Sequence, residues 1–263
     1  MRIRRHNTMF AALYGELVPH PWPDPHAARS DAYSLFVARS SAMGCLADAG
    51  EGMPGGLWAM NDAGHDQDPA SGSSHVLWFQ VSTEPVPAER PLPVQAFLSC
   101  AGDVVERIGT LRLEAVQVLL PLQSIDASTE DSSPLGSILQ AAGWFDDCSP
   151  QQKASVEVTL DGGQELNIHT MMPEMFTWMR ALQQDVFSLE SFSLADKGMK
   201  AKPRALSDLL WRGPSHHRVT FHGTLAEWSV DALGWVACLL AHTSYRHGVS
   251  GPLMFTASQR RSQ

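Results

Sequence analysis

The sequence predicts an α/β or α+β fold, in which helices pack on a mixed β-sheet built from three strand–helix–strand units. Short runs of β-branched and aromatic residues alternate along the chain with stretches whose apolar residues recur at helical spacing. Helices placed between strands in this way pack against a sheet. A third observation is an apparent hairpin at 155–170, which indicates that the sheet is not purely parallel.

The first unit spans residues 75–120. Residues 75–82 (HVLWFQVS) are almost wholly apolar, which is typical of a strand covered on both faces. Residues 93–109 predict a helix that ends at Gly109, and residues 111–120 predict the next strand, which Pro121 ends. One helical stripe collects the apolar residues Phe97, Ala101, Val104, Val105 and Ile108.

The second unit begins with the hairpin. Residues 155–160 (SVEVTL) alternate apolar and polar side chains, residues 161–163 (DGG) form the turn, and residues 164–170 (QELNIHT) give the answering strand. A helix then follows, with Pro173 in its first turn, where a missing N–H is tolerated. It runs to about Gln184 and leads to a strand at 186–194.

The third unit closes the chain. Residues 217–223 predict a strand, and a helix follows with Ser229 as its N-cap and Gly248 just beyond its end. Residues 252–258 (PLMFTAS) predict the final strand.

The N-terminal part is less regular. We divide the chain into an irregular or helical segment and linker at 1–74 and a mixed-sheet domain at 75–263, which together form one compact domain. Residues 32–50 fit a helix or a strand, and the Pro-rich residues 19–26 indicate a connector. Polar residues without periodicity predict loops at 61–74 and 123–134.

Composition excludes several classes of protein. The chain has 263 residues with 44% hydrophobic residues, which is ordinary for a folded protein. A net charge of −9 disfavours nucleic-acid binding. No apolar run is long enough to cross a membrane, and four scattered cysteines without a signal peptide indicate the cytoplasm. The abundance of Ala, Gly, Pro and Arg is typical of GC-rich bacteria.

The sequence carries no motif for a common cofactor. A P-loop, a dinucleotide-binding GxGxxG run, a nucleophile elbow, HExxH and an EF-hand are all absent. We therefore expect no cofactor.

Histidines concentrate in residues 216–223 (HHRVTFHG) and 242–248 (HTSYRHG). A metal needs three or four converging ligands. His216 and His222 share a strand face, but six residues separate them by roughly 20 Å. His242 and His247 lie five positions apart, on different faces of a helix. We therefore expect no metal site.

Acid–base chemistry is the alternative function for these histidines. His222 and His169 are each predicted at the end of a strand. If these strand ends meet, the two histidines share a pocket. His222, His169 and His242 are therefore the candidates for proton transfer. Arg218 and Arg246 are the candidates for holding an anionic group. A solvent-exposed strand face explains the same pattern without chemistry.

A Met-rich helix gives the candidate apolar wall. Met171, Met175 and Met179 recur at four-residue intervals, with Trp178 beside them. Flexible thioethers suit an irregular apolar ligand, although such a stripe is also typical of a core.

Two functions remain. The first is a cytoplasmic, biosynthetic enzyme or a binding protein for a small, partly apolar organic molecule, which uses metal-independent His chemistry and Arg anion binding. The alternative is a non-catalytic interaction or structural protein that forms an oligomer or a hetero-complex. A small-molecule ligand and a possible homo-oligomer are thus the expected partners.

Overall fold

The structure is a computed structural model, and it describes residues 7–22, 31–47, 55–65, 75–126, 133–163, 168–194, 206, 210–211 and 217–260. The strands are β1 (Thr8–Pro19), β2 (Trp58–His65), β3 (His75–Thr83), β4 (Val86–Pro87), β5 (Gly109–Leu120), β6 (Ile125–Asp126), β7 (Ala154–Asp161), β8 (Phe187–Ser193), β9 (Arg218–Leu225) and β10 (Leu253–Gln259). The helices are α1 (Ala32–Ala42), α2 (Val94–Ile108), α3 (Leu135–Ala142), α4 (Ile168–Ala181) and α5 (Val230–Arg246).

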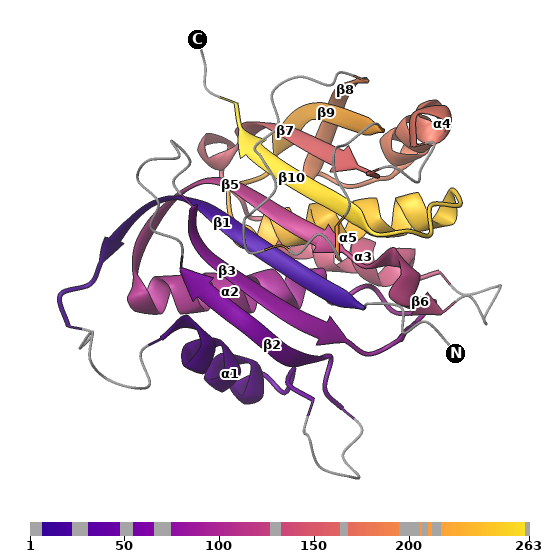
Figure 1. The fold of residues 1–263 in the computed structure, drawn as a ribbon. Helices are drawn as coiled ribbons and strands as arrows, with labels where there is room; N and C mark the ends of the chain where they lie inside the picture. The colour runs from indigo at the N-terminus through magenta and orange to yellow at the C-terminus, as the bar shows by residue number, and fades with distance from the viewer. Residues whose placement is uncertain are drawn as a thin grey trace, which may run out of the picture.

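The strands of the described residues form a large and a small sheet. The large one has eight strands in the order β2-β3-β1-β5-β10-β7-β9-β8 (Figure 1), and every neighbouring pair is antiparallel. The small one pairs β4 with β6 in parallel. With helices packed on the large sheet, the predicted α+β class is confirmed.

The large sheet consists of two halves with the same order of connections. The first half contains, in chain order, β1, α1, β2, β3, α2 and β5. The second half contains, in the same order, β7, α4, β8, β9, α5 and β10. In each half the first strand lies between the third and the fourth, and the second lies outside the third. This is the βαββαβ order of a ferredoxin-like unit. The two fourth strands, β5 and β10, pair at the centre and join the halves.

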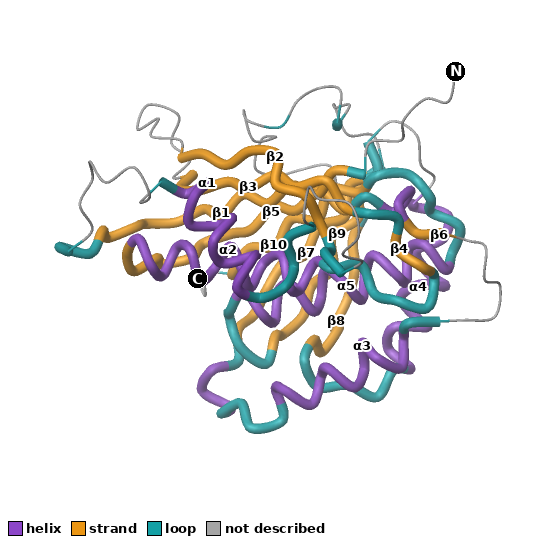
Figure 2. The backbone as a smooth tube through the Cα atoms, turned by 90° about the horizontal axis from the view of Figure 1, so that it is seen from below, coloured by secondary structure: helices purple, strands orange, loops and turns teal. Residues whose placement is uncertain are grey.

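The helices cover one face of the large sheet (Figure 2). α5 lies in the middle of this layer, where it packs against α2, α3 and α4 as well as β5 and β10. Every residue of α5 from Ala232 to Ser244 is consequently buried. Apolar side chains at alternate positions of the strands, such as Val116, Val118 and Phe255, meet the helices and form the main core.

The other face of the sheet differs between the two halves. Phe10, Tyr14 and Leu119 in the first half form a second apolar cluster, on which Leu206 and Trp211 pack. In the second half, Met254 of β10 joins this cluster, whereas β7 and β9 carry polar side chains, and the hydroxyls of Thr159 and Thr220 lie 2.9 Å apart. Where the halves meet, the buried Gln117 accepts a 2.5 Å hydrogen bond from Tyr14 and donates a 3.3 Å hydrogen bond to Thr256.

The three strand–helix–strand units are present as β3–α2–β5, β7–α4–β8 and β9–α5–β10. The predicted hairpin is wrong, because Ile168–Thr170 form the first turn of α4 and residues 164–167 lie outside the described residues. Both edges of β7 are instead filled by β10 and β9. An answering strand at 164–170 would have no free edge to join.

The N-terminal 74 residues contain two strands of the large sheet. β1 lies between β3 and β5, and its first residues are buried because both faces of the sheet are covered there. Residues 32–42 of the ambiguous segment form α1. The loop predicted at 61–74 is wrong at 61–65, which belong to β2, and residues 66–74 lie outside the described residues. β2 is an edge strand, so its polar residues face solvent.

No described helix is both long and apolar enough to cross a membrane.

Candidate functional site

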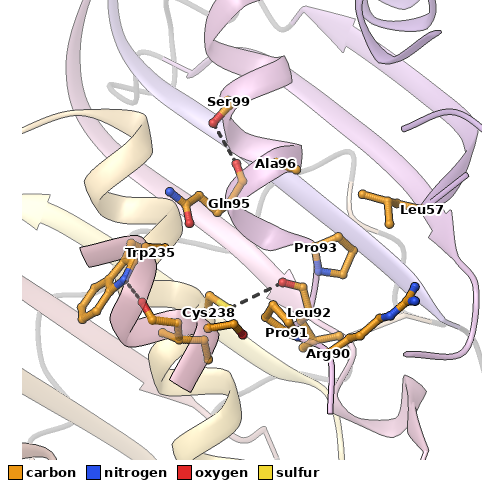
Figure 3. Close-up of a pocket in the computed structure, with 13 residues that line it drawn as sticks. Leu57, Arg90, Pro91, Leu92, Pro93, Gln95, Ala96, Ser99, Trp235 and Cys238 are labelled. Carbon is orange, nitrogen blue, oxygen red and sulfur yellow. Dashed lines mark hydrogen bonds between the residues drawn. The ribbon is translucent and has the colours of Figure 1, made fainter. Parts of the chain in front are cut away.

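A cavity of about 490 Å³ lies between α2, α3, α5 and the loop that precedes α2 (Figure 3). Its walls are mainly apolar, which is typical of sites for small organic molecules. The lining residues are Leu57, Arg90, Pro91, Leu92, Pro93, Gln95, Ala96, Ser99, Ser137, Ile138, Ala141, Trp235 and Cys238.

Two side chains of α5 hold the loop at 90–93 in place. The backbone N–H of Leu92 donates to His242 Nε2 at 2.9 Å, and the Cys238 thiol donates to the Leu92 carbonyl at 3.6 Å. Cys238 and His242 are four residues apart, so both lie on one face of the helix. Prolines on either side of Leu92 restrict the loop further. The wall of the cavity is therefore fixed before any ligand binds.

Close packing of the helices defines the inner end of the cavity. A Cβ on Gly234 of α5 would lie 2.9 Å from the Cα of Gln95, so a glycine is needed for α2 and α5 to approach this closely. The indole N–H of Trp235 donates to the Ile138 carbonyl at 2.7 Å and ties α3 to α5. Trp235 is fully buried behind the wall of the cavity and supports it as a rigid aromatic ring.

Arg90 supplies the positive charge of the cavity. It is the one charged residue among those that line the cavity, its side chain is exposed, and it forms no ion pair with another described residue. Gln95, Ser99 and Ser137 add uncharged polar groups. A guanidinium at the mouth of an apolar cavity suits a ligand with a carboxylate, phosphate or sulfonate at one end.

The buried titratable groups beside the cavity are neutral. Burial raises the pKa of the Cys238 thiol to about 12, so this sulfur is not a nucleophile at neutral pH. Burial lowers the pKa of His242 to about 4, and its Nε2 is occupied as an acceptor by Leu92. The geometry gives His242 a positioning contact with the loop, and its predicted proton-transfer role stays a prediction.

His222, a predicted proton-transfer residue, lies in a polar cluster on the face of the sheet opposite the helices and the cavity. Its Nδ1 is 3.5 Å from Glu157 Oε1 on β7, and its Nε2 is 3.4 Å from Ser193 Oγ on β8. Arg260 Nε lies 3.7 Å from the same Glu157 oxygen. The Nδ1 atom is buried and has no hydrogen-bond partner of good geometry among the described residues. A carboxylate, an imidazole and a hydroxyl thus follow one another across three strands.

The prediction that His222 lies at the end of its strand is wrong, because β9 continues to Leu225. Gly223 stays in the ladder, where a Cβ would lie 2.5 Å from the Ser188 carbonyl of β8. His169 lies in the first turn of α4 and contacts the Arg218 carbonyl at 2.9 Å. Four residues of β9, about 13 Å, separate this contact from His222, so the two imidazoles do not meet in one pocket.

The two predicted arginines have different partners. Arg218 Nε is 3.4 Å from Asp161 Oδ2, and their side chains are 12% and 1% exposed, so this guanidinium already has a buried carboxylate partner. The exposed Arg246 lies over the ring of Trp178, with 5.5 Å between its Cζ and the ring centroid. The structure leaves their predicted role in anion binding untested.

The Met-rich helix packs into the core. Met175 and Met179 are buried, Met171 and Trp178 are half-buried, and none of the four lines the cavity. The buried Met172, one position away from the predicted stripe, completes this packing. A contribution of these residues to ligand binding stays a prediction.

Sequence reasoning missed the cavity. Its residues come from four separate segments, and neither Arg90 nor Trp235 stands in a recognisable motif. The one local signal is RPLP at 90–93, a rigid segment with a single cation directly before a helix. Among the described residues, no three His, Cys, Asp or Glu side chains converge as a metal site.

No protein-family model matches this chain, and no curated protein or solved structure is significantly similar to it.

Proposed function

We propose that this protein binds a small, mainly apolar molecule with one anionic group in the cavity between α2, α3 and α5. The observation that carries the proposal is the cavity of about 490 Å³ with the Arg90 guanidinium at its mouth, which forms no ion pair with another described residue. The apolar part of the ligand lies against Leu57, Ala96 and Ala141, apolar lining residues with accessible surface, and the anion lies at Arg90. The free thiols of all four cysteines support a cytoplasmic location.

The expected affinity is moderate. Burial of each methylene contributes about 0.8 kcal/mol, and association opposes it by several kcal/mol. A ligand of the size of decanoate gains about 6–7 kcal/mol from its eight methylenes and a little more from the ion pair, so its dissociation constant is expected at about 0.1–1 mM. The fixed loop at 90–93 helps, because a wall that is already ordered loses little entropy on binding.

Competition between matched ligands tests the proposal. The probe is anilinonaphthalene sulfonate, whose fluorescence rises in an apolar site, and decanoate and decanol are the competitors. We expect decanoate to displace the probe at about tenfold lower concentration than decanol, because only the carboxylate pairs with Arg90. Arg90→Gln should remove this preference. Arg107→Gln, on an exposed arginine in the last turn of α2, is the matched control.

A second variant tests the location without changing charge. Ala141→Phe places a ring in the cavity from the partly exposed side of α3 and should weaken binding of both competitors. Equal displacement by the two ligands in the native protein, or unchanged binding in both variants, would contradict the proposal. Absence of binding in a protein that forms a discrete oligomer would favour the interaction role instead.

A second candidate function is metal-independent acid–base chemistry at His222. The order Glu157–His222–Ser193 is favourable for it, because a carboxylate orients the imidazole that accepts a proton from the hydroxyl. Hydrolysis of p-nitrophenyl acetate and labelling of Ser193 by a fluorophosphonate test this candidate. Both should be lost in His222→Ala and kept in His20→Ala. Labelling that is absent, or that survives in His222→Ala, would exclude it.

A further inference from the structure

Three sulfur atoms meet where α1 ends. Met43 is the C-cap of α1, Cys45 follows it after Gly44, and Cys100 lies on α2. Gly44 has φ of +67°, a conformation that favours glycine and turns the chain back towards the helix. The backbone N–H of Cys45 then donates to the Ser40 carbonyl at 2.8 Å. The turn thereby places Met43 and Cys45 beside α2.

Cys100 lies beside both of the other sulfur-containing residues. Cys100 Sγ lies 3.4 Å from Met43 Sδ. The Cys45 thiol lies beside the Cys100 thiol, and Cys45 Sγ lies 3.7 Å from the Met43 carbonyl. Three sulfurs around one metal at about 2.3 Å each stand about 4 Å apart. The 3.4 Å between Cys100 Sγ and Met43 Sδ is about 0.6 Å short of this spacing, so a metal enters once these two side chains move apart by that amount.

Burial and charge also suit a cation. Cys100 is fully buried and Cys45 is 6% exposed, whereas Met43 is 41% exposed and leaves a path from solvent. Arg39 lies near both sulfurs and pairs with Asp103 at 2.6 Å. Its positive charge complements an anionic metal–thiolate group.

We propose that Met43, Cys45 and Cys100 bind one monovalent copper ion. Two thiols release their protons to water, two thiolates and one thioether donate electron pairs to Cu(I), and the group has a net charge of −1 beside Arg39. The oxidation state of copper does not change. Thioether and thiolate donors select Cu(I) over harder divalent ions, and three ligands fall short of the four that structural zinc takes. This site is independent of the proposed ligand cavity.

Anaerobic titration of the whole protein with Cu(I), in competition with the chromogenic chelator bicinchoninate, tests the proposal. We expect one Cu(I) per chain, with ultraviolet absorption from thiolate-to-copper charge transfer. Cys45→Ser and Cys100→Ser should each weaken binding about 100-fold or more, and Met43→Leu about tenfold. Cys148→Ser and Cys238→Ser are the matched controls and should bind as the native protein does.

Folding is checked separately, because Cys100 is in the core. Met43→Leu changes a partly exposed side chain and keeps the test valid if Cys100→Ser does not fold. Failure to remove copper from bicinchoninate, unchanged binding in Cys45→Ser, or stronger binding of Zn²⁺ than of Cu(I) would each overturn the proposal. The fluorescence assay with anilinonaphthalene sulfonate reports the ligand cavity, so failure of one proposal is distinguishable from failure of the other.

Discussion

Replacing His242 by Gln should make the stability of this protein less sensitive to acid. The imidazole Nε2 accepts the backbone N–H of Leu92 at 2.9 Å, and the glutamine side-chain oxygen can take over this contact. Glutamine does not titrate. The native protein and the variant should therefore have similar stability at pH 7 and diverge as the pH falls.

The direction and size follow from the pKa values of His242. Burial lowers the pKa from 6.5 to about 4 in the folded protein, so between these values the unfolded chain binds a proton that the folded chain does not. The stability contributed by the neutral imidazole is complete above pH 6.5 and is lost as the pH falls towards 4. The whole difference corresponds to about 3 kcal/mol, of which about 2 kcal/mol is lost between pH 7 and pH 5.

Urea unfolding at pH 7, 6 and 5, followed by tryptophan fluorescence, measures this difference. Other titrating groups contribute equally to both proteins and cancel in the comparison. His65→Gln, at an exposed position in β2, is the control and should follow the native curve. A native protein and a His242→Gln variant with the same pH dependence would refute the assignment of His242 as a buried, neutral acceptor.

Three further changes test the packing around the site, each by urea unfolding. Gly234→Ala should destabilise the protein by about 1–3 kcal/mol, because the new Cβ meets the α2 backbone at 2.9 Å; Gly136→Ala, with open space around it in α3, should be neutral or slightly stabilising. Asp161→Ala should cost about 3 kcal/mol, since it leaves the Arg218 charge without its buried partner, and a cost below about 1 kcal/mol would contradict this. Ser229→Ala should cost about 1 kcal/mol through loss of the N-cap of α5, and an unchanged midpoint would show that the cap is not needed.

Local signals predicted most of the helices and strands correctly. The predicted N-cap Ser229 accepts from the Ala232 N–H, and Gly109 is the C-cap of α2. These elements are fixed by residues within a few positions of one another. The hairpin failed for a non-local reason, because the pairing of β7 is decided by β9 and β10, which lie far along the chain.

The histidines show the limit of arguments from alternation. Alternation placed Arg218, Thr220 and His222 correctly on the face opposite the core, away from the helices. It could not show that Asp161 neutralises Arg218 or that Glu157 and Ser193 flank His222, since these contacts come from neighbouring strands. The proximity of Cys45 and Cys100 was also invisible, since one lies in the turn after α1 and the other on α2, far apart in the sequence.

The duplicated topology explains why a cavity forms between α2 and α5. These two helices hold equivalent places in the two βαββαβ halves, and they pack against each other where β5 and β10 join the sheet. The surrounding elements do not follow the duplication. β4 and the loop at 88–93 are inserted before α2, whereas only residues 226–229 connect β9 to α5. The linker between the halves adds α3, which packs on α5.

The cavity is thus bounded by equivalent helices and by segments that have no counterpart in the other half. Ligand sites are common at interfaces between structural units of a protein. A ligand held there contacts α2 from the first half, α5 from the second and α3 from the linker. Binding would therefore stabilise the junction itself, so a ligand that fits should raise the unfolding midpoint of the whole protein and not of one half alone.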